Sequence, residues 1–547
     1  MNSSSKFNSF FALILVPLVL LLSSCSERSE YGKKSDYEKL GAACITTEDV
    51  TAPTVSSESP TDNSTYNSVA TTAVVTFSEI MATGSVTTNT SDTTCSGSFQ
   101  LSSDNFTTCI KMSAAPVASD NDTIFTITPA SSLSAATTFK VKITTSVTDI
   151  SCNTLGSDNS SIVGFSTSPS GSGTITGSVQ MDNGSALSGV GVSDALFGST
   201  VATMTSDSNG DFSQASLALG MHALTYSKSG YLGLTMRELL ETDGETINLE
   251  TVRLLPDNCT SGTMSGTITD AVTGDNMSGV NLYYTSGINK NFTWRTGTYF
   301  GQTDENGVWS LPNSNYPSSI SAGWYTILSN KSGYYKDYHN AEVCGDKPNQ
   351  DNSLSSRLNE GEMRIMLKWP ITNPITGVDL DSHISIPDND STGTFHLYYD
   401  VNVGNNYGFG GDYYVYGAGD NVTLDLDSDN TSGRPSPPGK ETITILSGAA
   451  TKVRSGTFSY SVHNFTDKDN DSGQGDCCPN YKTNLSKSRA KVKVFYNDQG
   501  TLVRKRFNVP NDNGTLWRVF TFDSSGSGSG FTRVDNMTYE STTANVY

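Results

Sequence analysis

Short runs in which apolar and polar residues alternate recur along the chain from residue 51 to its end. Residues 73–77, 124–128 and 139–143 are examples, and clusters of Asn, Asp, Ser, Pro and Gly separate such runs. Because alternate residues of a strand share one face, a period of two over about five residues predicts strands that bury one face. The pattern therefore predicts an all-β protein made of several β-sandwich domains in series.

The first residues follow a different pattern, because an apolar run at 10–22 comes after a segment whose one charged side chain is Lys6. The run is too short for a permanent membrane-spanning helix and is typical of an export signal. Ser23 and Ser24 directly before Cys25 resemble the lipobox of bacterial lipoproteins. The resemblance implies that residues 1–24 are a lipoprotein signal peptide and that Cys25 is acylated. An ordinary secretory signal is the alternative.

Residues 25–50 are polar, carry both signs of charge and show no apolar period, so they are interpreted as a tether. A lipidated Cys25 would anchor the chain to a membrane. Ser26, where Asp would retain a Gram-negative lipoprotein, favours sorting to the outer membrane. We therefore expect a protein of the cell envelope, an outer-membrane lipoprotein that faces the periplasm or the cell surface.

Residues 51–168 contain several short sequence motifs, namely Ala-Pro-Thr-Val at 52–55, Val-Val-Thr-Phe-Ser-Glu-Ile-Met at 74–81, Phe-Thr-Ile-Thr-Pro at 125–129 and Gly-Phe-Ser-Thr at 164–167. These motifs resemble those of the bacterial Ig-like domain of the S-layer type. The resemblance implies a spacer or an adhesive module and supplies no catalytic residue. The stretch from Cys95 to Cys109 departs from the family pattern and is interpreted as an inserted loop.

An internal repeat follows a Ser/Gly linker at 168–173, with copies at 174–256 and 259–358. Three motifs recur in the same order, at 177–179, 207–212 and 230–231 in the first copy and at 266–268, 304–309 and 333–334 in the second. The Asn-Gly pairs at 209–210 and 306–307 predict tight hairpins, each followed by a strand that starts with an inward aromatic residue, Phe212 or Trp309. Both copies resemble the carboxypeptidase regulatory-like domain, a small sandwich of the transthyretin or carbohydrate-binding-like type.

Residues 360–547 form a last domain, for which turn spacing predicts a sandwich or jelly roll. The predicted strands are 363–369, 378–386, 395–399, 413–416, 422–426, 441–445, 457–465, 490–496, 502–509 and 517–522. Residues 524–530 are interpreted as a loop or a tail linker. The motifs at 379–383, 425–427 and 441–445 resemble an uncharacterised bacterial β-domain found at the end of exported proteins, which has no established activity.

The formal charge is −21, from 34 Lys and Arg against 55 Asp and Glu, so the chain as a whole repels nucleic acid. Acidic clusters in the last domain suit Ca²⁺, a hard cation with oxygen ligands. The strand at 379–383 would place Asp379, Asp381 and His383 on one face. The candidate calcium ligands are Asp379, Asp381, Asp425, Asp427, Asp429, Asp467, Asp469 and Asp471. Solvated acidic turns are the alternative.

Eight cysteines remain besides Cys25, an even number that suits an oxidising compartment. Candidate disulfides are Cys95 with Cys109, Cys259 with Cys344, and Cys44 with Cys152. The adjacent Cys477 and Cys478 would form a strained disulfide with each other. Metal binding or an intermolecular disulfide is the alternative for these two residues. Spacing alone does not determine the connectivity.

Catalytic patterns are scarce, since none of the five histidines stands in a recognisable triad or in a His-Glu-x-x-His motif. His339 and Glu342 have the spacing with which zinc carboxypeptidases begin their metal site, but we interpret His339 as a surface histidine near a sandwich edge. We therefore expect that the protein is not an enzyme. We expect an adhesive or structural surface lipoprotein whose partner is a polysaccharide or another surface protein. One alternative is a carbohydrate-binding protein with the aromatic residues Trp294, Tyr299, Trp324, Tyr334 and Tyr335. The other is an enzyme whose site lies in the C-terminal domain.

Overall fold

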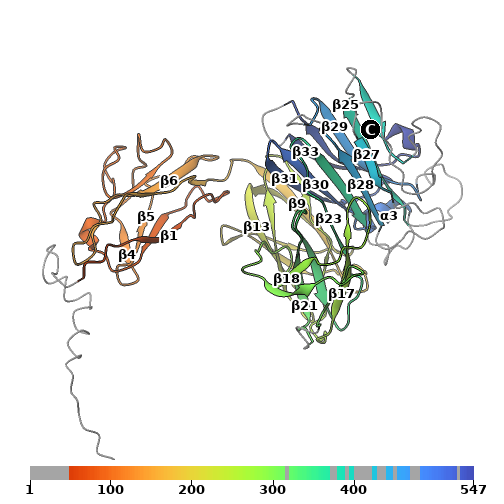
Figure 1. The fold of residues 1–547 in the computed structure, drawn as a ribbon, viewed down its shortest axis with the longest axis horizontal. Coiled ribbons are helices and arrows are strands. Elements are labelled where there is room, and N and C mark those ends of the chain that lie inside the picture. Colours follow the sequence, from red (N-terminus) through yellow and green to blue (C-terminus); the bar gives the residue numbers. More distant parts are fainter. Residues whose placement is uncertain are drawn as a thin grey trace, which may run out of the picture. The chain divides into compact units, whose positions relative to one another are not determined.

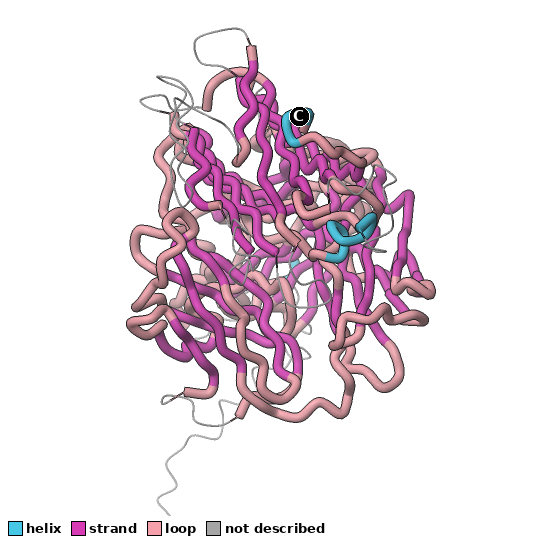
Figure 2. The backbone as a smooth tube through the Cα atoms, turned by 90° about the vertical axis from the view of Figure 1, so that its right-hand side faces the viewer, coloured by secondary structure: helices cyan, strands magenta, loops and turns pink. Residues whose placement is uncertain are grey.

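The computed structural model describes residues 49–313, 319–369, 378–387, 393–399, 422–427, 439–447, 453–467, 481–525 and 530–546. Strands make up nearly all of its regular structure, as Figure 2 shows, so the predicted all-β class is confirmed. The chain divides into two units at Thr167 and Ser168. Cys25, the signal peptide and the tether lie outside the described residues.

The first unit packs two sheets around one apolar core that includes Val75, Phe99, Phe125 and Phe139. One sheet has the order β1-β2-β5-β4, with bounds Val55–Ser59, Ala73–Phe77, Ile124–Ile127 and Val117–Ser119. In the other sheet β6 pairs with β3, β7 and β8, with bounds Thr138–Ile143, Phe99–Ser102, Asn159–Ser160 and Phe165–Ser166. The 3₁₀ turn η1 spans Thr83–Ser85. The three alternating runs of this region are confirmed as β2, β5 and β6.

The interpretation of residues 95–109 as an inserted loop was wrong. This stretch contains β3, whose Phe99 lies opposite Ile143 of β6. Phe99 and Leu101 are both buried, because the strand supplies one wall of the core. A disulfide joins Cys95 to Cys109 and so brackets β3 on both sides.

The first repeat folds as two facing sheets. One contains β12-β9-β15, with β16 also paired to β9, at Asp211–Ala218, Ser172–Gln180, Thr246–Asn248 and Val252–Arg253. The other has the order β11-β10-β13-β14, at Ser199–Thr205, Gly191–Leu196, Gly220–Ser227 and Leu234–Leu240. Their inner faces share one core around Leu224, Tyr226 and Leu254.

The second repeat has the same strand order. Its sheets are β20-β17-β23, at Val308–Leu311, Met264–Asp270 and Asn352–Leu354, and β19-β18-β21-β22, at Thr298–Gln302, Asn281–Ser286, Gly323–Asn330 and Asp337–Val343. In both copies the last strand of the smaller sheet pairs in parallel with the first. A disulfide between Cys259 and Cys344 ties the start of the second copy to the end of β22.

The predicted Asn-Gly turns form, but they do not make hairpins. Gly210 and Gly307 adopt positive φ angles of 83° and 72°, and Asp207 and Asp304 accept backbone hydrogen bonds across the turn. The strand after each turn pairs with the first strand of its repeat rather than with the strand before it. The hairpin prediction was therefore wrong, since each turn carries the chain from one sheet to the other.

The inward aromatic residues that follow these turns explain the glycine shared by the two copies. Phe212 lies opposite Gly177, and Trp309 lies opposite Gly266. A Cβ on Gly177 would come within 2.6 Å of the Phe212 ring, and one on Gly266 within 3.0 Å of the Trp309 indole nitrogen. The missing side chain makes room for the aromatic ring in the core.

The C-terminal domain is a sandwich of two five-stranded sheets. Sheet A has the order β27-β28-β24-β30-β31, at Val422–Leu426, Gly439–Ile445, Met363–Trp369, Lys491–Asp498 and Thr501–Asn508. Sheet B has the order β26-β25-β29-β32-β33, at Thr394–Leu397, Leu380–Pro387, Thr457–Asn464, Leu516–Asp523 and Phe531–Thr538. Nine of the ten predicted strands correspond to these elements, and 413–416 lies outside the described residues.

Three elements of this domain were missed by the sequence analysis: β33, the helix α3 at Tyr481–Lys487 and the 3₁₀ turn η3 at Thr543–Asn545. Because β33 pairs along β32, the stretch after Asp523 leads to a further strand and is not a tail linker. Exposed residues at 532, 534 and 536 alternate with partly buried ones at 531, 533 and 535, and β33 is an edge strand of sheet B.

Both repeats and the C-terminal sandwich belong to one compact unit. Figure 1 shows the yellow and green strands of the repeats beside the blue strands of the sandwich. Ion pairs join them, with Lys491 on Glu250 at 2.5 Å and Arg533 on Glu245 at 3.2 Å. The Tyr335 ring stacks on Phe495 with ring centres 5.4 Å apart.

Candidate functional site

A pocket of about 710 Å³ lies where the two repeats meet the outer face of sheet A. Ten of the 34 lysines and arginines of the chain line it, against three carboxylates, Glu250, Glu342 and Asp351. The ten are Arg253, Lys290, Lys347, Lys368, Lys440, Arg489, Lys491, Lys493, Arg504 and Arg506. A strongly acidic chain thus concentrates its cations around one internal space, which we call the basic pocket.

Sheet A positions most of these cations through the alternation of its strands. Leu367, Val492 and Val494 point into the sandwich core, so their neighbours point outward to the pocket. In the strand register Lys368 lies opposite both Lys440 and Lys491. Lys493 likewise lies opposite Arg506. Like charges directly opposite each other destabilise a sheet, so this face depends on anionic groups brought to it from elsewhere.

The repeats supply part of that anionic charge. Lys493 binds Asp337 of β22 at 2.5 Å, and Lys491 binds Glu250 at the same distance. Burial alone would raise the pKa of Glu250 and of Asp337, but the adjacent lysines hold both below their usual values. These pairs keep the carboxylates charged and connect the modules.

A further set of ion pairs joins the two repeats at the pocket rim. Arg253 of the first repeat binds Glu342 of the second at 2.9 Å, and Lys347 of the second binds Asp182 of the first at 2.8 Å. The Arg253 guanidinium also lies 5.9 Å from the centre of the Trp324 ring. Both repeats are therefore needed to form the wall of the basic pocket.

Lys368 is a cation of the pocket that is held by a backbone group. Lys368 donates to the backbone carbonyl oxygen of Asp351, and among the described residues no carboxylate oxygen forms a salt bridge with it. Burial, with Lys493 and Lys440 nearby, lowers the pKa of Lys368 to about 7. An ammonium group at this position would be stabilised by any anion that enters the pocket.

His339 lies on β22 and lines the basic pocket, so its interpretation as a surface histidine was wrong. Burial, followed by the neighbouring Lys368, lowers the pKa of His339 to about 3 and keeps the ring neutral. Glu342, its partner in the His-x-x-Glu spacing, forms ion pairs with Arg253 and Lys347 instead. These two residues therefore do not form a carboxypeptidase-like metal pair.

The remaining lining is rich in amides, with six asparagines and Gln350, and includes the rings of Trp324 and Tyr338. Amide side chains both donate and accept hydrogen bonds, as hydroxyl-rich ligands require. Of the five aromatic residues considered for sugar binding, Trp324 lines the pocket. Trp294 and Tyr299 are exposed elsewhere, at 57% and 41%. Tyr334 donates to Asp270, and Tyr335 lies in the contact with β30.

The structure separates several of the candidate calcium ligands. Asp425 accepts hydrogen bonds from Thr423 and Thr444 of its own sheet, and Asp467 accepts them from the amides of Asn464 and Asn484. Asp379 precedes β25 and Asp427 follows β27, in different sheets. Asp429, Asp469, Asp471, Cys477 and Cys478 lie outside the described residues. Among the described residues of the candidate set, no two of these aspartates belong to one metal-ligand group; the carboxylates that do come within 4.8 Å of one another, Asp49, Glu79 and Asp149, lie in the first unit.

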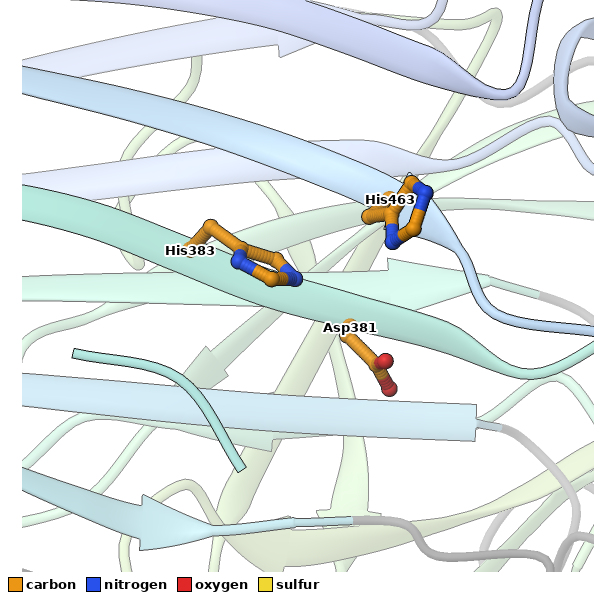
Figure 3. Close-up of side chains that lie close together, drawn as sticks. All are labelled: Asp381, His383 and His463. Carbon is orange, nitrogen blue, oxygen red and sulfur yellow. The ribbon is translucent and has the colours of Figure 1, made fainter. Parts of the chain in front are cut away.

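Asp381 instead lies beside two histidines, His383 on its own strand and His463 on β29, as Figure 3 shows. Asp381 and His383 lie two residues apart on β25 and share one face of the strand, as predicted, and both are buried. His463 was missed, since it is 80 residues away in sequence and becomes a neighbour through the register of β25 and β29.

A buried carboxylate on the inner face of sheet A was also missed as a functional candidate. Glu441 accepts a hydrogen bond from the backbone amide of Ser382 on the facing sheet. Burial, then the charges of Asp427 and Asp381, raises the pKa of Glu441 well above its usual range. The group is therefore held in its neutral form over a wide pH range.

Comparison with known proteins identifies one module. Residues 49–167 match the family model of the bacterial Ig-like domain, in agreement with the resemblance in the sequence. No curated protein sequence matches the chain. No helix among the described residues is long and apolar enough to cross a membrane.

Solved structures give only distant likenesses. The Bacillus anthracis TIE protein is 12% identical, with 86% of this chain and 73% of that chain covered and a TM-score of 0.15. A streptococcal ancillary pilin is 13% identical, with 44% and 80% covered and a TM-score of 0.15. The shaft pilin spaA from Lactobacillus rhamnosus GG is 13% identical, with 34% and 97% covered and a TM-score of 0.13. Scores this low carry no argument about arrangement or function.

Proposed function

We propose that the protein is a non-catalytic binding protein of the bacterial envelope, which holds an acidic saccharide in the basic pocket. The observation that carries the proposal is the excess of ten cations over three carboxylates around one space of about 710 Å³. That volume is typical of sites for small ligands and is too small for a nucleic-acid duplex. The amide side chains and Trp324 favour a hydroxyl-rich ligand over a bare inorganic anion.

In this proposal Cys25 carries the lipid anchor, and the Ig-like domain separates the binding unit from the membrane. The lipobox-like sequence and the family match at 49–167 support it. Partition of the expressed protein into detergent, with incorporation of labelled palmitate, measures the anchor. Cys25→Ser should abolish both, and a variant that still incorporated palmitate would contradict the assignment.

Binding is tested by calorimetric titration of the full chain with an oligogalacturonate, and with a neutral maltooligosaccharide of the same length. We expect the acidic ligand to bind, with an affinity that falls as salt concentration rises, and the neutral ligand to bind at least 10-fold more weakly. Equal affinities, or no binding of either ligand, would contradict an acidic saccharide.

Lys368→Met is the informative variant, because removing a buried charge should stabilise the fold but lower the affinity for the acidic ligand. A hydrogen bond to a charged group contributes about 1.5 to 3 kcal/mol, so a loss of roughly 10- to 100-fold in affinity is expected. Lys336→Met is the matched control, since Lys336 is exposed on the same repeat and does not line the pocket. Equal affinities for the two variants would exclude the pocket as the binding site.

A further inference from the structure

The outer face of sheet B carries a second, separate cluster of polar side chains. Asp381 and His383 are two residues apart on β25, and Asp381 lies directly opposite His463 of β29. One ligand atom from each residue lies within 4.8 Å of the others. Figure 3 shows the three side chains at adjacent positions on the two neighbouring strands. All three are at least 96% buried, with exposures of 4%, 1% and 0%.

Both imidazoles are oriented by a partner on the ring nitrogen that faces away from the cluster. His463 Nε2 lies 2.9 Å from the carbonyl oxygen of Glu540 and donates to it. His383 Nδ1 lies 2.9 Å from His396 Nε2. His383 Nε2 has no hydrogen-bond partner among the described residues.

This arrangement is the one that metal-binding histidines adopt, with one ring nitrogen on the metal and the other held by a carbonyl or a second polar group. Because the ligand atoms of all three buried side chains lie within 4.8 Å of one another, the two rings present their donors to the same small region as the Asp381 carboxylate.

The donor set decides the class of metal. Two imidazole nitrogens and one carboxylate oxygen suit Zn²⁺ and related divalent transition metals, whereas Ca²⁺ takes six to eight oxygen ligands. Zinc bonds of about 2.1 Å in a tetrahedron place ligand atoms roughly 3.4 Å apart. The separations here are within about 1.4 Å of that value, which small side-chain rotations can close.

We propose that Asp381, His383 and His463 form a binding site for Zn²⁺ on the outer face of sheet B. The carboxylate and the two imidazoles supply three ligands, and a fourth position stays open for water or another donor. The bound ion would neutralise the buried Asp381 and tie β25 to β29. This site differs from the predicted calcium site in metal and in membership, because it adds His463 and omits the other aspartates.

The test uses the full chain, stripped with chelator and then titrated with Zn²⁺ or Ca²⁺ while thermal unfolding and bound metal are measured. We expect one equivalent of zinc whose binding raises the unfolding temperature by several degrees, and no effect of calcium at the same concentration. Stabilisation by calcium but not by zinc would overturn the proposal. So would a zinc equivalent that leaves stability unchanged.

Variants separate this site from other zinc ligands in the chain. Asp381→Asn and His463→Gln should each weaken zinc binding at least 10-fold. They should also remove the visible absorption of the Co²⁺-substituted protein. His222→Gln is the matched control, because His222 is buried against Asp194 at 2.8 Å in the first repeat, outside the cluster. Circular dichroism of each metal-free variant checks the fold, and undiminished zinc affinity in folded Asp381→Asn would overturn the assignment.

Discussion

The two outer faces of the C-terminal sandwich are built in the same way but carry different polar chemistry. On sheet A the outward positions of β24, β30 and β31 hold Lys368, Lys491, Lys493 and Arg506, and the repeats cover them. On sheet B the outward positions of β25 and β29 hold one carboxylate and two imidazoles, and burial lowers the pKa of His383 well below its usual value. The first face is lined by cations, while the second combines one carboxylate with two histidines.

The difference shows two ways to bury a polar face. Sheet A relies on carboxylates from other modules, Glu250 and Asp337, which make its packing on the repeats specific. Buried ion pairs of this kind contribute more to specificity than to net stability, but breaking one by removing a single partner is strongly destabilising. On sheet B the His383 ring stacks on Tyr398, with ring centres 5.2 Å apart, and its Nδ1 lies 2.9 Å from His396 Nε2.

The largest effect is expected when sheet A loses an anionic partner. Asp337→Asn leaves Lys493 among other cations without its carboxylate, which should destabilise the second unit by about 3 kcal/mol in urea unfolding. Adding Lys493→Met to this variant should recover most of the loss, because the unpaired charge is then gone. If the double variant were as unstable as the single one, the ion pair would not be the cause.

Removing an unpaired cation from the same face should have the opposite sign. The pKa of Lys368 is about 7 in the folded chain, against about 10.4 when unfolded. The unfolded state therefore binds more protons between pH 7 and 10.4, so stability should rise with pH across that window. Lys368→Met should be about 2 kcal/mol more stable at pH 7 and lack that rise, measured by urea unfolding at several pH values. A parallel pH profile in wild type and variant would contradict the pKa.

Glu441, on the inner face of sheet A, differs from the carboxylates that pair with lysines on the outer face, because the groups that act on it most strongly are other carboxylates. Its folded pKa lies above its ordinary value, so the folded state binds more protons and stability should fall as pH rises from about 4.5 through the folded pKa. Glu441→Gln keeps an acceptor for the Ser382 amide and should be about 1 kcal/mol more stable at pH 8. Thermal unfolding at pH 5 and pH 8 measures it, and equal pH dependence in both proteins would exclude a raised pKa.

The smallest effect is expected at the edge of sheet A. Lys505 of β31 binds Glu241 at 2.7 Å, but both side chains are about one third exposed or slightly less. Exposed pairs of this kind contribute roughly 0.2 to 1 kcal/mol, so Lys505→Met should change stability by less than about 1 kcal/mol. A loss as large as that of Asp337→Asn would show that exposure does not separate the two pairs.

Much of the local structure could be predicted from residue patterns. Alternation identified nine strands of the last domain, and the shared Gly, Asn-Gly and aromatic positions identified two copies of one fold. The pairing at the Asn-Gly turns could not be predicted, because the same turn serves a hairpin or a change of sheet. The basic pocket has one signal in the sequence, since cations stand at 491 and 493 and at all three positions of 504–506.

Local patterns identify nine strands of the last domain, the two similar repeats and the side of these strands that faces the core, because a period of two acts between neighbours along the chain. What covers the outward sides depends on contacts between segments far apart in the sequence. Lys368 resembles an ordinary solvated position in the sequence and lines a pocket because the repeats cover sheet A, and His463 becomes a neighbour of Asp381 through the register of β25 and β29. Net charge likewise sums over the whole chain, whereas electrostatic interactions act over a few ångströms.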